Sequence, residues 1–152
     1  MIRKFLPFII VILMMTGCKK QETDYKPIDK AIIEKYLADN SLTAQSTASG
    51  LYYIITKAGG LNHPGLTSAV TLKYKGYLTD DTVFDQTLAT GLPTSFQLSG
   101  MIDGWKEGVP LIGIGVKIKL LIPSDLAYGA TAKTGIPAHS VLIFDIELID
   151  FY

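Results

Sequence analysis

The chain has 152 residues, of which 48% are hydrophobic and 18% are charged, and its formal net charge at pH 7 is zero. This length suits one domain rather than two, and the composition is that of a globular rather than a disordered protein. Arg3 is the only arginine. Because arginine dominates bidentate recognition of phosphates and bases, we expect no nucleic-acid partner.

Residues 1–17 have the features of a secretory signal peptide. Arg3 and Lys4 precede an apolar run from Phe5 to Met15, which is shorter than the roughly 20 residues that span a bilayer. The sequence Met-Thr-Gly-Cys that ends at Cys18 resembles the lipobox of bacterial lipoproteins, in which the cysteine becomes the lipidated N-terminus. We therefore expect fatty acids such as palmitate on Cys18 to anchor the protein to a bacterial membrane, on the periplasmic or surface face of the cell envelope.

An ordinary signal anchor, or a cleaved signal with an incidental cysteine, is the alternative to this lipid anchor. Cys18 is the only cysteine in the chain, which excludes an intrachain disulfide and a cysteine metal cluster. A lone cysteine placed directly after the small residues that end a signal favours the lipoprotein interpretation.

Residues 18–50 are expected to form a tether followed by an N-terminal helix. The stretch from residue 19 to residue 26 is polar, and Pro27 suits the first position of a helix. Apolar residues then recur at a spacing of four, which predicts an amphipathic helix over residues 27–37 that packs on the domain or on a partner: Ile28, Ile32 and Tyr36. Residues 40–50 are rich in Ser, Thr and Ala and are expected to form a loop.

From residue 51 onward the hydrophobic pattern changes to a period of two, which is typical of half-buried antiparallel strands. Strands are expected within residues 51–56, 70–78, 116–122 and 142–148, and residues 102–109 have helical spacing for about two turns. Strands outnumber helices and most links are short. We therefore predict that residues 51–152 form an α+β domain, a curved antiparallel β-sheet wrapped on one short α-helix.

Common catalytic motifs are missing from the sequence. It has no Gly-x-Ser-x-Gly elbow, no phosphate loop and no dinucleotide fingerprint. The two histidines, His63 and His139, lie far apart in the sequence and are expected to be ordinary loop residues. We therefore predict no metal site and no cofactor.

Five fragments carry a family resemblance: Val70–Gly76 (VTLKYKG), Phe84-Asp85, Gly104–Gly108 (GWKEG), Ile122–Gly129 (IPSDLAYG) and Gly135–Leu148 (GIPAHSVLIFDIEL). In this order and at these spacings they resemble the FKBP-type (macrolide-binding) peptidyl-prolyl cis-trans isomerases, over roughly residues 51–152. The resemblance implies the curved-sheet fold named above and an isomerase that assists the folding of cell-envelope proteins. It also implies proline-containing polypeptides as substrates and macrolides as ligands.

The resemblance further implies one apolar proline pocket. It assigns catalytic positions to Tyr74, Phe84, Asp85, Tyr128 and Phe144, and substrate-binding positions to Met101, Ile102, Trp105 and Ile136. Trp105 would form the floor, Asp85 would orient Tyr74, and the Tyr128 hydroxyl and the Ile102 N–H would donate to substrate carbonyls. A twisted X-Pro amide has less charge separation than a planar one, so a dry apolar pocket favours it without any acid, base, nucleophile or metal.

Periodicity alone would treat the same aromatic residues as ordinary core. Two departures from the family pattern add to that alternative: residues 86–91 offer no basic partner for Asp85, and Thr94 stands where many relatives carry a pocket aromatic, which predicts a lower and more polar wall. A non-catalytic FKBP-like binding or scaffold lipoprotein is therefore the second hypothesis. The third is a lipoprotein whose helix at residues 27–37 docks a membrane protein or a second copy.

Overall fold

The computed structural model describes residues 23–57, 59–87 and 91–152. The expected signal peptide and Cys18 lie outside these residues. Within the described ranges, no helix is long and apolar enough to cross a membrane.

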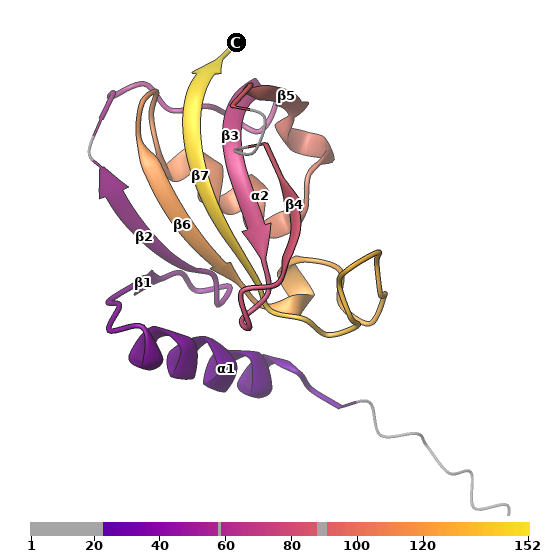
Figure 1. Ribbon diagram of the computed structural model, residues 1–152. Helices are drawn as coiled ribbons and strands as arrows, with labels where there is room; N and C mark the ends of the chain where they lie inside the picture. The colour runs from indigo at the N-terminus through magenta and orange to yellow at the C-terminus, as the bar shows by residue number, and fades with distance from the viewer. Residues whose placement is uncertain (1–22, 58, 88–90) are drawn as a thin grey trace, which may run out of the picture.

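One seven-stranded antiparallel sheet forms the body of the protein, with the strand order β1-β2-β6-β7-β3-β4 and with β5 paired to β3 (Figure 1). The long strands β3 and β7 lie next to each other and hold Tyr74 opposite Ile146. The strands are β1 (Gln45–Ser46), β2 (Tyr52–Lys57), β3 (Ala69–Tyr77), β4 (Val83–Gln86), β5 (Thr94–Gln97), β6 (Lys117–Ile122) and β7 (Leu142–Phe151).

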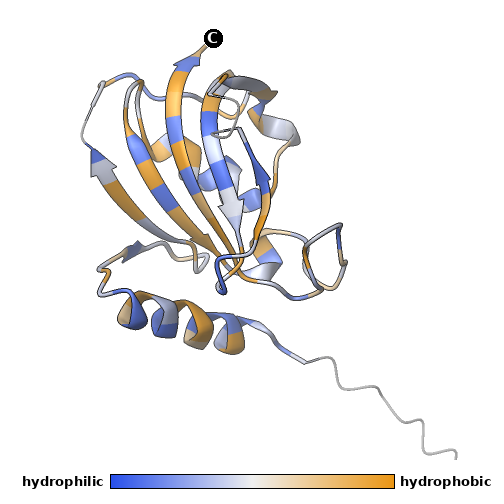
Figure 2. Ribbon diagram, in the orientation of Figure 1, coloured by the Kyte–Doolittle hydropathy of each residue, from blue (hydrophilic) through white to orange (hydrophobic). Residues whose placement is uncertain are grey.

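The main core lies between the concave face of the sheet and α2 (Asp103–Gly108). Hydrophobic and hydrophilic residues alternate along β6 and β7 (Figure 2), so every second side chain enters this core. Gly104 lets α2 approach the sheet closely, because a Cβ there would lie 2.5 Å from Cγ2 of Ile122. Three 3-10 turns complete the links: η1 (Leu98–Gly100), η2 (Val109–Leu111) and η3 (Ser124–Leu126). The predicted α+β fold, a curved antiparallel sheet on one short helix, is confirmed.

The N-terminal helix α1 (Lys26–Asp39) covers one end of the opposite face of the sheet (Figure 1). The expected apolar face is wrong at two of its three positions, because Ile28 and Ile32 are 42% and 36% exposed. Tyr36 is partly buried against the sheet, and the buried residues of α1 are Asp29, Ile33 and Leu37. Ile33 and Leu37 form a second apolar cluster with residues that point away from the main core, namely Tyr77, Leu121, Val141 and Ile143. The face of α1 that packs on the sheet is therefore shifted by one residue from the face that the hydrophobic spacing predicted.

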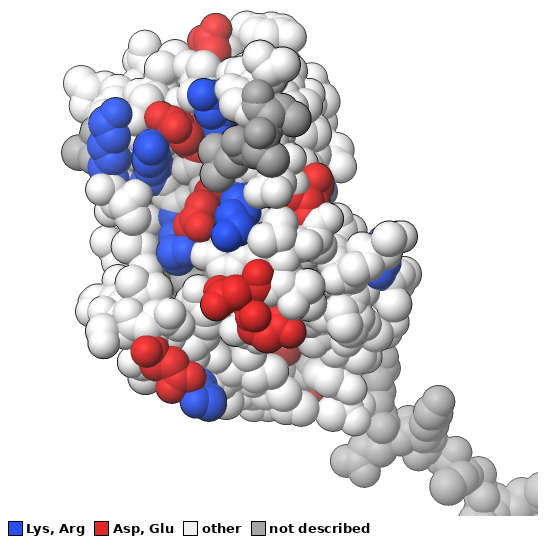
Figure 3. Space-filling view, viewed as in Figure 1, with Lys and Arg blue, Asp and Glu red and all other residues white. Residues whose placement is uncertain are grey.

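Positive and negative side chains lie side by side on the rest of this face (Figure 3). Lys119 Nζ lies 2.6 Å from Asp145 Oδ1, and Lys117 Nζ lies 3.5 Å from Glu147 Oε2. Tyr77 accepts a hydrogen bond from Lys119 and donates one to Asp145 at the edge of α1. Three short strands, β1, β4 and β5, were not predicted, because two to four residues are too few for a period of two to be visible.

Candidate active site

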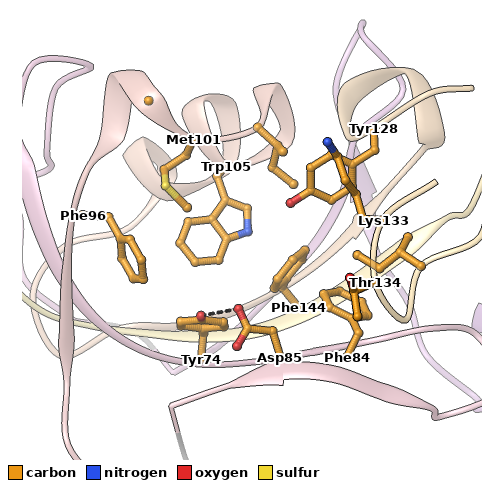
Figure 4. A pocket seen from close by; sticks show the side chains of 13 residues that line it. Tyr74, Phe84, Asp85, Phe96, Met101, Trp105, Tyr128, Lys133, Thr134 and Phe144 are labelled. Carbon is orange, nitrogen blue, oxygen red and sulfur yellow. Dashed lines mark hydrogen bonds between the residues drawn. The ribbon is translucent and has the colours of Figure 1, made fainter. Parts of the chain in front are cut away.

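A cavity of about 580 Å³ opens between the concave face of the sheet, α2 and the loop that follows η3 (Figure 4). Its size lies within the range of small-molecule and peptide side-chain pockets. The strands β3, β4, β5 and β7 supply five of its thirteen lining residues, and the η1–α2 segment and the loop after η3 supply four each. The lining residues are Tyr74, Phe84, Asp85, Phe96, Gly100, Met101, Ile102, Trp105, Tyr128, Lys133, Thr134, Ile136 and Phe144.

Trp105 of α2 lies in the middle of an aromatic cluster and is only 1% exposed. Its ring makes edge-to-face contacts with Tyr74 and Phe144, each at 5.2 Å between ring centroids, and with Phe96 at 5.8 Å. Interplanar angles of 81° to 89° match the arrangement that aromatic quadrupoles prefer. The cluster is therefore held rigidly and forms an apolar floor that a ligand does not have to build.

Phe84 and Phe144 form the next wall, with their ring centroids 5.5 Å apart at 81°. Gly76 of β3 makes room for them: a Cβ at this position would lie 2.7 Å from Cε1 of Phe144 and 2.7 Å from Cε2 of Phe84. The two rings thus rest directly on the backbone of a central strand. Glycine is the residue type that this close approach requires.

Tyr74 and Asp85 form the polar pair of the cavity. The Tyr74 hydroxyl donates to Asp85 Oδ2 at 2.6 Å, across the β3–β4 pairing. Burial, together with the neighbouring carboxylate, raises the pKa of Tyr74 above its ordinary value. Tyr74 is therefore a neutral donor throughout the physiological pH range, and the bond fixes the position of Asp85 at the pocket edge.

The rim of the cavity carries two further hydrogen-bond donors. Tyr128 is 36% exposed, and Lys133 Nζ lies 5.5 Å from the centre of its ring. At the start of α2, the Ile102 backbone N–H has no acceptor among the described residues. Tyr128 and Ile102 both line the cavity.

All nine residues that the sequence assigned to the pocket line this one cavity. Their individual roles stay predictions. Thr94 does not line it, and the expected lower wall is wrong, because Phe96 occupies that side against Tyr74 and Trp105. Asp85 forms no ion pair with a described residue, in keeping with the missing basic partner.

Sequence reasoning missed four lining residues, namely Phe96, Gly100, Lys133 and Thr134. Phe96 lies opposite Val70 in the β3–β5 pairing, and an aromatic in a four-residue strand beside a long apolar strand was the available signal. Lys133 and Thr134 reach the cavity through the fold of their loop, in which Lys133 bridges to Ile136. No local pattern marks that loop. In the described part of the chain, no group of three His, Cys, Asp or Glu could hold a metal ion.

Comparisons with known proteins agree with this geometry. The pattern of the family described as FKBP-type peptidyl-prolyl cis-trans isomerase matches residues 61–149. A relative from Aeromonas hydrophila, the "FKBP-type peptidyl-prolyl cis-trans isomerase FkpA", is 45% identical over 118 residues, which cover 76% of this chain and 44% of the relative. The chain spans about half the length of the curated FkpA relatives it matches.

Two solved structures have the same fold. The crystal structure of FkpA from Escherichia coli superposes with a TM-score of 0.73 at 38% identity, covering 83% of this chain and 60% of that one. A peptidyl-prolyl cis-trans isomerase from Pseudomonas syringae gives a TM-score of 0.70 at 29% identity, covering 86% and 97%. On this sequence match and this fold, the chain belongs to the family of FKBP-type peptidyl-prolyl cis-trans isomerases.

Proposed function

We propose that this protein catalyses the cis-trans isomerisation of X-Pro bonds in polypeptides. The observation that carries the proposal is the preformed aromatic cavity, in which Trp105 is enclosed by Tyr74, Phe96 and Phe144 at right angles. A pyrrolidine ring is a compact apolar group that such a cavity can bury. The membership of the family described above supports the same activity.

The chemistry of the reaction suits a cavity without a nucleophile. Rotation about a peptide bond has a barrier of about 18–20 kcal/mol because the amide loses conjugation as it twists, and uncatalysed X-Pro isomerisation takes tens to hundreds of seconds at 25 °C. The twisted amide is less polar than the planar one. A dry aromatic site therefore costs the twisted state less desolvation energy than the planar state, which lowers the barrier.

The polar groups at the edge of the cavity then position the peptide. In this proposal the Tyr128 hydroxyl and the Ile102 N–H donate to substrate carbonyls on either side of the proline. Phe84 and Phe144 line the side along which the X-Pro carbonyl turns. Asp85, held by the Tyr74 hydroxyl, keeps that ring in its place against Trp105. Macrolides are proposed as competing ligands of the same apolar surface.

The test is the rate of cis-to-trans isomerisation in short X-Pro-Phe peptides, with X varied, in the presence of the purified chain. Acceleration that disappears in Phe144→Ala would support the proposal. A folded protein that accelerates no peptide in the series would contradict it and would favour a non-catalytic binding or scaffold protein that uses the same cavity.

We also propose that the protein is a lipoprotein of the cell envelope that assists folding there, anchored through Cys18. The support is the sequence of residues 1–18 alone. Six residues lie between Cys18 and Tyr25, so a lipid anchor on Cys18, seven Cα–Cα steps away, would hold the domain within about 25 Å of the membrane surface. Two or more acyl chains give stable attachment, at about 0.8 kcal/mol for each buried CH₂.

A further inference from the structure

Tyr25 and the first turn of α1 contact residues at the two ends of the loop that borders the proposed proline pocket, His139 at its end and Ser124 just before its start. This pocket loop, residues 127–139, carries Tyr128, Lys133, Thr134 and Ile136. The ring of Tyr25, just before α1, stacks on His139 with a centroid separation of 3.5 Å and an interplanar angle of 5°. Asp29 contacts the start of η3, directly before the pocket loop. Two residues of the N-terminal segment therefore hold the two ends of one loop.

Asp29 is fully buried, and the hydrogen bonds of its carboxylate all come from one residue. Its Oδ2 accepts from the Ser124 backbone N–H at 2.8 Å and from the Ser124 hydroxyl at 2.6 Å, while Oδ1 is buried without a partner in the described chain. A buried carboxylate with an unsatisfied oxygen is costly, although its place in the first turn of a helix favours its charge. Asp29 is not needed to pack α1 on the sheet, because Ile33 and Leu37 supply the apolar contacts.

Ser124, which is bonded to Asp29, is also bonded to the pocket loop through its backbone carbonyl. Its carbonyl oxygen accepts from the N–H of Ala127 at 3.0 Å and from the N–H of Gly129 at 2.8 Å, and these two residues flank Tyr128. The Gly129 carbonyl then accepts from the His139 N–H at 2.8 Å, which closes the loop. The position of the Tyr128 ring is thus linked to Asp29 through three residues.

His139 shows strain at the other end of the loop. Its φ is 56°, in the left-handed region that a residue with a side chain occupies at a cost. Such a conformation persists where the surroundings fix it. The stack with Tyr25 and the bond to Gly129 are the contacts that fix it here.

We propose that Tyr25 and Asp29 are positioning residues for the pocket: they hold the pocket loop, and with it Tyr128, in the conformation that receives a proline-containing peptide. The inference deepens the proposed function and rests on it. It gives Tyr25 and α1 a role in the function of the site, although none of the described residues before β1 lines the cavity. Because Tyr128 would contact the peptide in the planar and the twisted state alike, loss of this support should raise KM more than it lowers kcat.

The experiment compares Asp29→Ala and Tyr25→Ala with matched variants in the full chain. Asp29→Asn keeps an acceptor for Ser124, and Tyr25→Phe keeps the ring that stacks on His139. Leu37→Ala is the control, because it weakens the packing of α1 two turns away from the loop. Amide hydrogen exchange at Gly129 and His139 reports the loop. The peptide assay gives kcat and KM.

We expect Asp29→Ala to speed exchange at Gly129 and His139 by about tenfold and to raise KM by about fivefold, on the scale of one or two lost hydrogen bonds. Asp29→Asn should recover most of both effects, and Leu37→Ala should lower the melting temperature without changing either. Tyr25→Ala should speed exchange mainly at His139, and Tyr25→Phe should not. If Asp29→Ala does not fold, the comparison of Tyr25→Ala with Tyr25→Phe tests the proposal by itself.

Unchanged exchange and KM in Asp29→Ala and Tyr25→Ala, relative to Leu37→Ala, would overturn the proposal. So would an Asp29→Asn protein as impaired as Asp29→Ala. If the unmodified chain isomerises no peptide, the proposed function fails. The exchange comparison then still shows whether the N-terminal segment holds the loop.

Discussion

Gly76→Ala tests whether the close seating of Phe84 and Phe144 on β3 matters for the site. The added methyl would lie 2.7 Å from a ring carbon of each phenylalanine, about 1 Å inside the usual carbon–carbon contact distance. Gly76 is paired on both sides, to Asp85 of β4 and to Phe144 of β7, so the strand cannot move away. Both rings must therefore shift toward the cavity.

The cost of this overpacking is about 1–3 kcal/mol of unfolding free energy. Replacing glycine within a strand returns about 0.5–1 kcal/mol by lowering the entropy of the unfolded chain. The net loss should thus be at most about 2.5 kcal/mol, small enough for the domain to stay folded. A displacement of about 1 Å at a reacting site can cost on the order of 100-fold in rate, so we expect kcat/KM for an X-Pro-Phe peptide to fall by about 10- to 100-fold.

The matched control is Gly65→Ala. No atom lies within 4 Å of a Cβ at this position, and its backbone is outside the left-handed region. Urea unfolding and the peptide assay are measured for both variants. If Gly76→Ala has the same kcat/KM and the same stability as Gly65→Ala, then Phe84 and Phe144 are not packed tightly against β3.

Three further predictions concern the polar groups and the anchor. Burial and Asp85 raise the pKa of Tyr74, and burial and Asp145 raise that of Tyr77. Each neutral hydroxyl should therefore contribute stability that is fully present below pH 10 and is lost as the pH rises further. A urea midpoint that does not fall above pH 10 would contradict this, and so would a Tyr77→Phe midpoint that falls as much as that of the unmodified chain. Asp85→Ala removes the acceptor of the Tyr74 hydroxyl and should lower kcat/KM by about fivefold. Asp85→Asn keeps an acceptor and should lower kcat/KM less. Equal losses in the two variants would show that the charge of Asp85 matters rather than its hydrogen bond to Tyr74. Cys18→Ala should move the protein from the membrane fraction to the supernatant and abolish labelling by palmitate, and a variant that stays membrane-bound would exclude the lipid as the anchor.

The sheet could be predicted from the sequence because its long strands carry their own signal. In β3, β6 and β7 apolar residues alternate with lysines and acids, and a single face is buried over most of their length. The pocket residues were found by a different route, the joint match of five fragments to one family. No local property distinguishes Trp105 as a pocket floor from Trp105 as core, and it is in fact both, being 1% exposed and lining the cavity.

The parts that could not be predicted depend on long-range contacts. The buried face of α1 is selected by Tyr77, Leu121 and Ile143 of the sheet, and a hydropathy pattern gives no reason to bury Asp29. The wall at Phe96 depends on the register of β5 against β3. Lys133 enters the site only because its loop folds back on Ile136. The role of each of these residues can be recognised only in the tertiary structure.

We attribute the proposed acceleration of X-Pro isomerisation to the apolar cavity rather than to hydrogen bonding. The most direct test measures kcat/KM on the same X-Pro-Phe peptide for the unmodified chain, Phe144→Ala and Tyr128→Phe, with folding checked by circular dichroism. Phe144→Ala should lose about 3–5 kcal/mol of stability and essentially all acceleration. Tyr128→Phe should stay within about tenfold of the unmodified chain, since it loses one hydroxyl. A folded Tyr128→Phe protein as inactive as Phe144→Ala would contradict the account and assign the catalysis to the hydrogen bond.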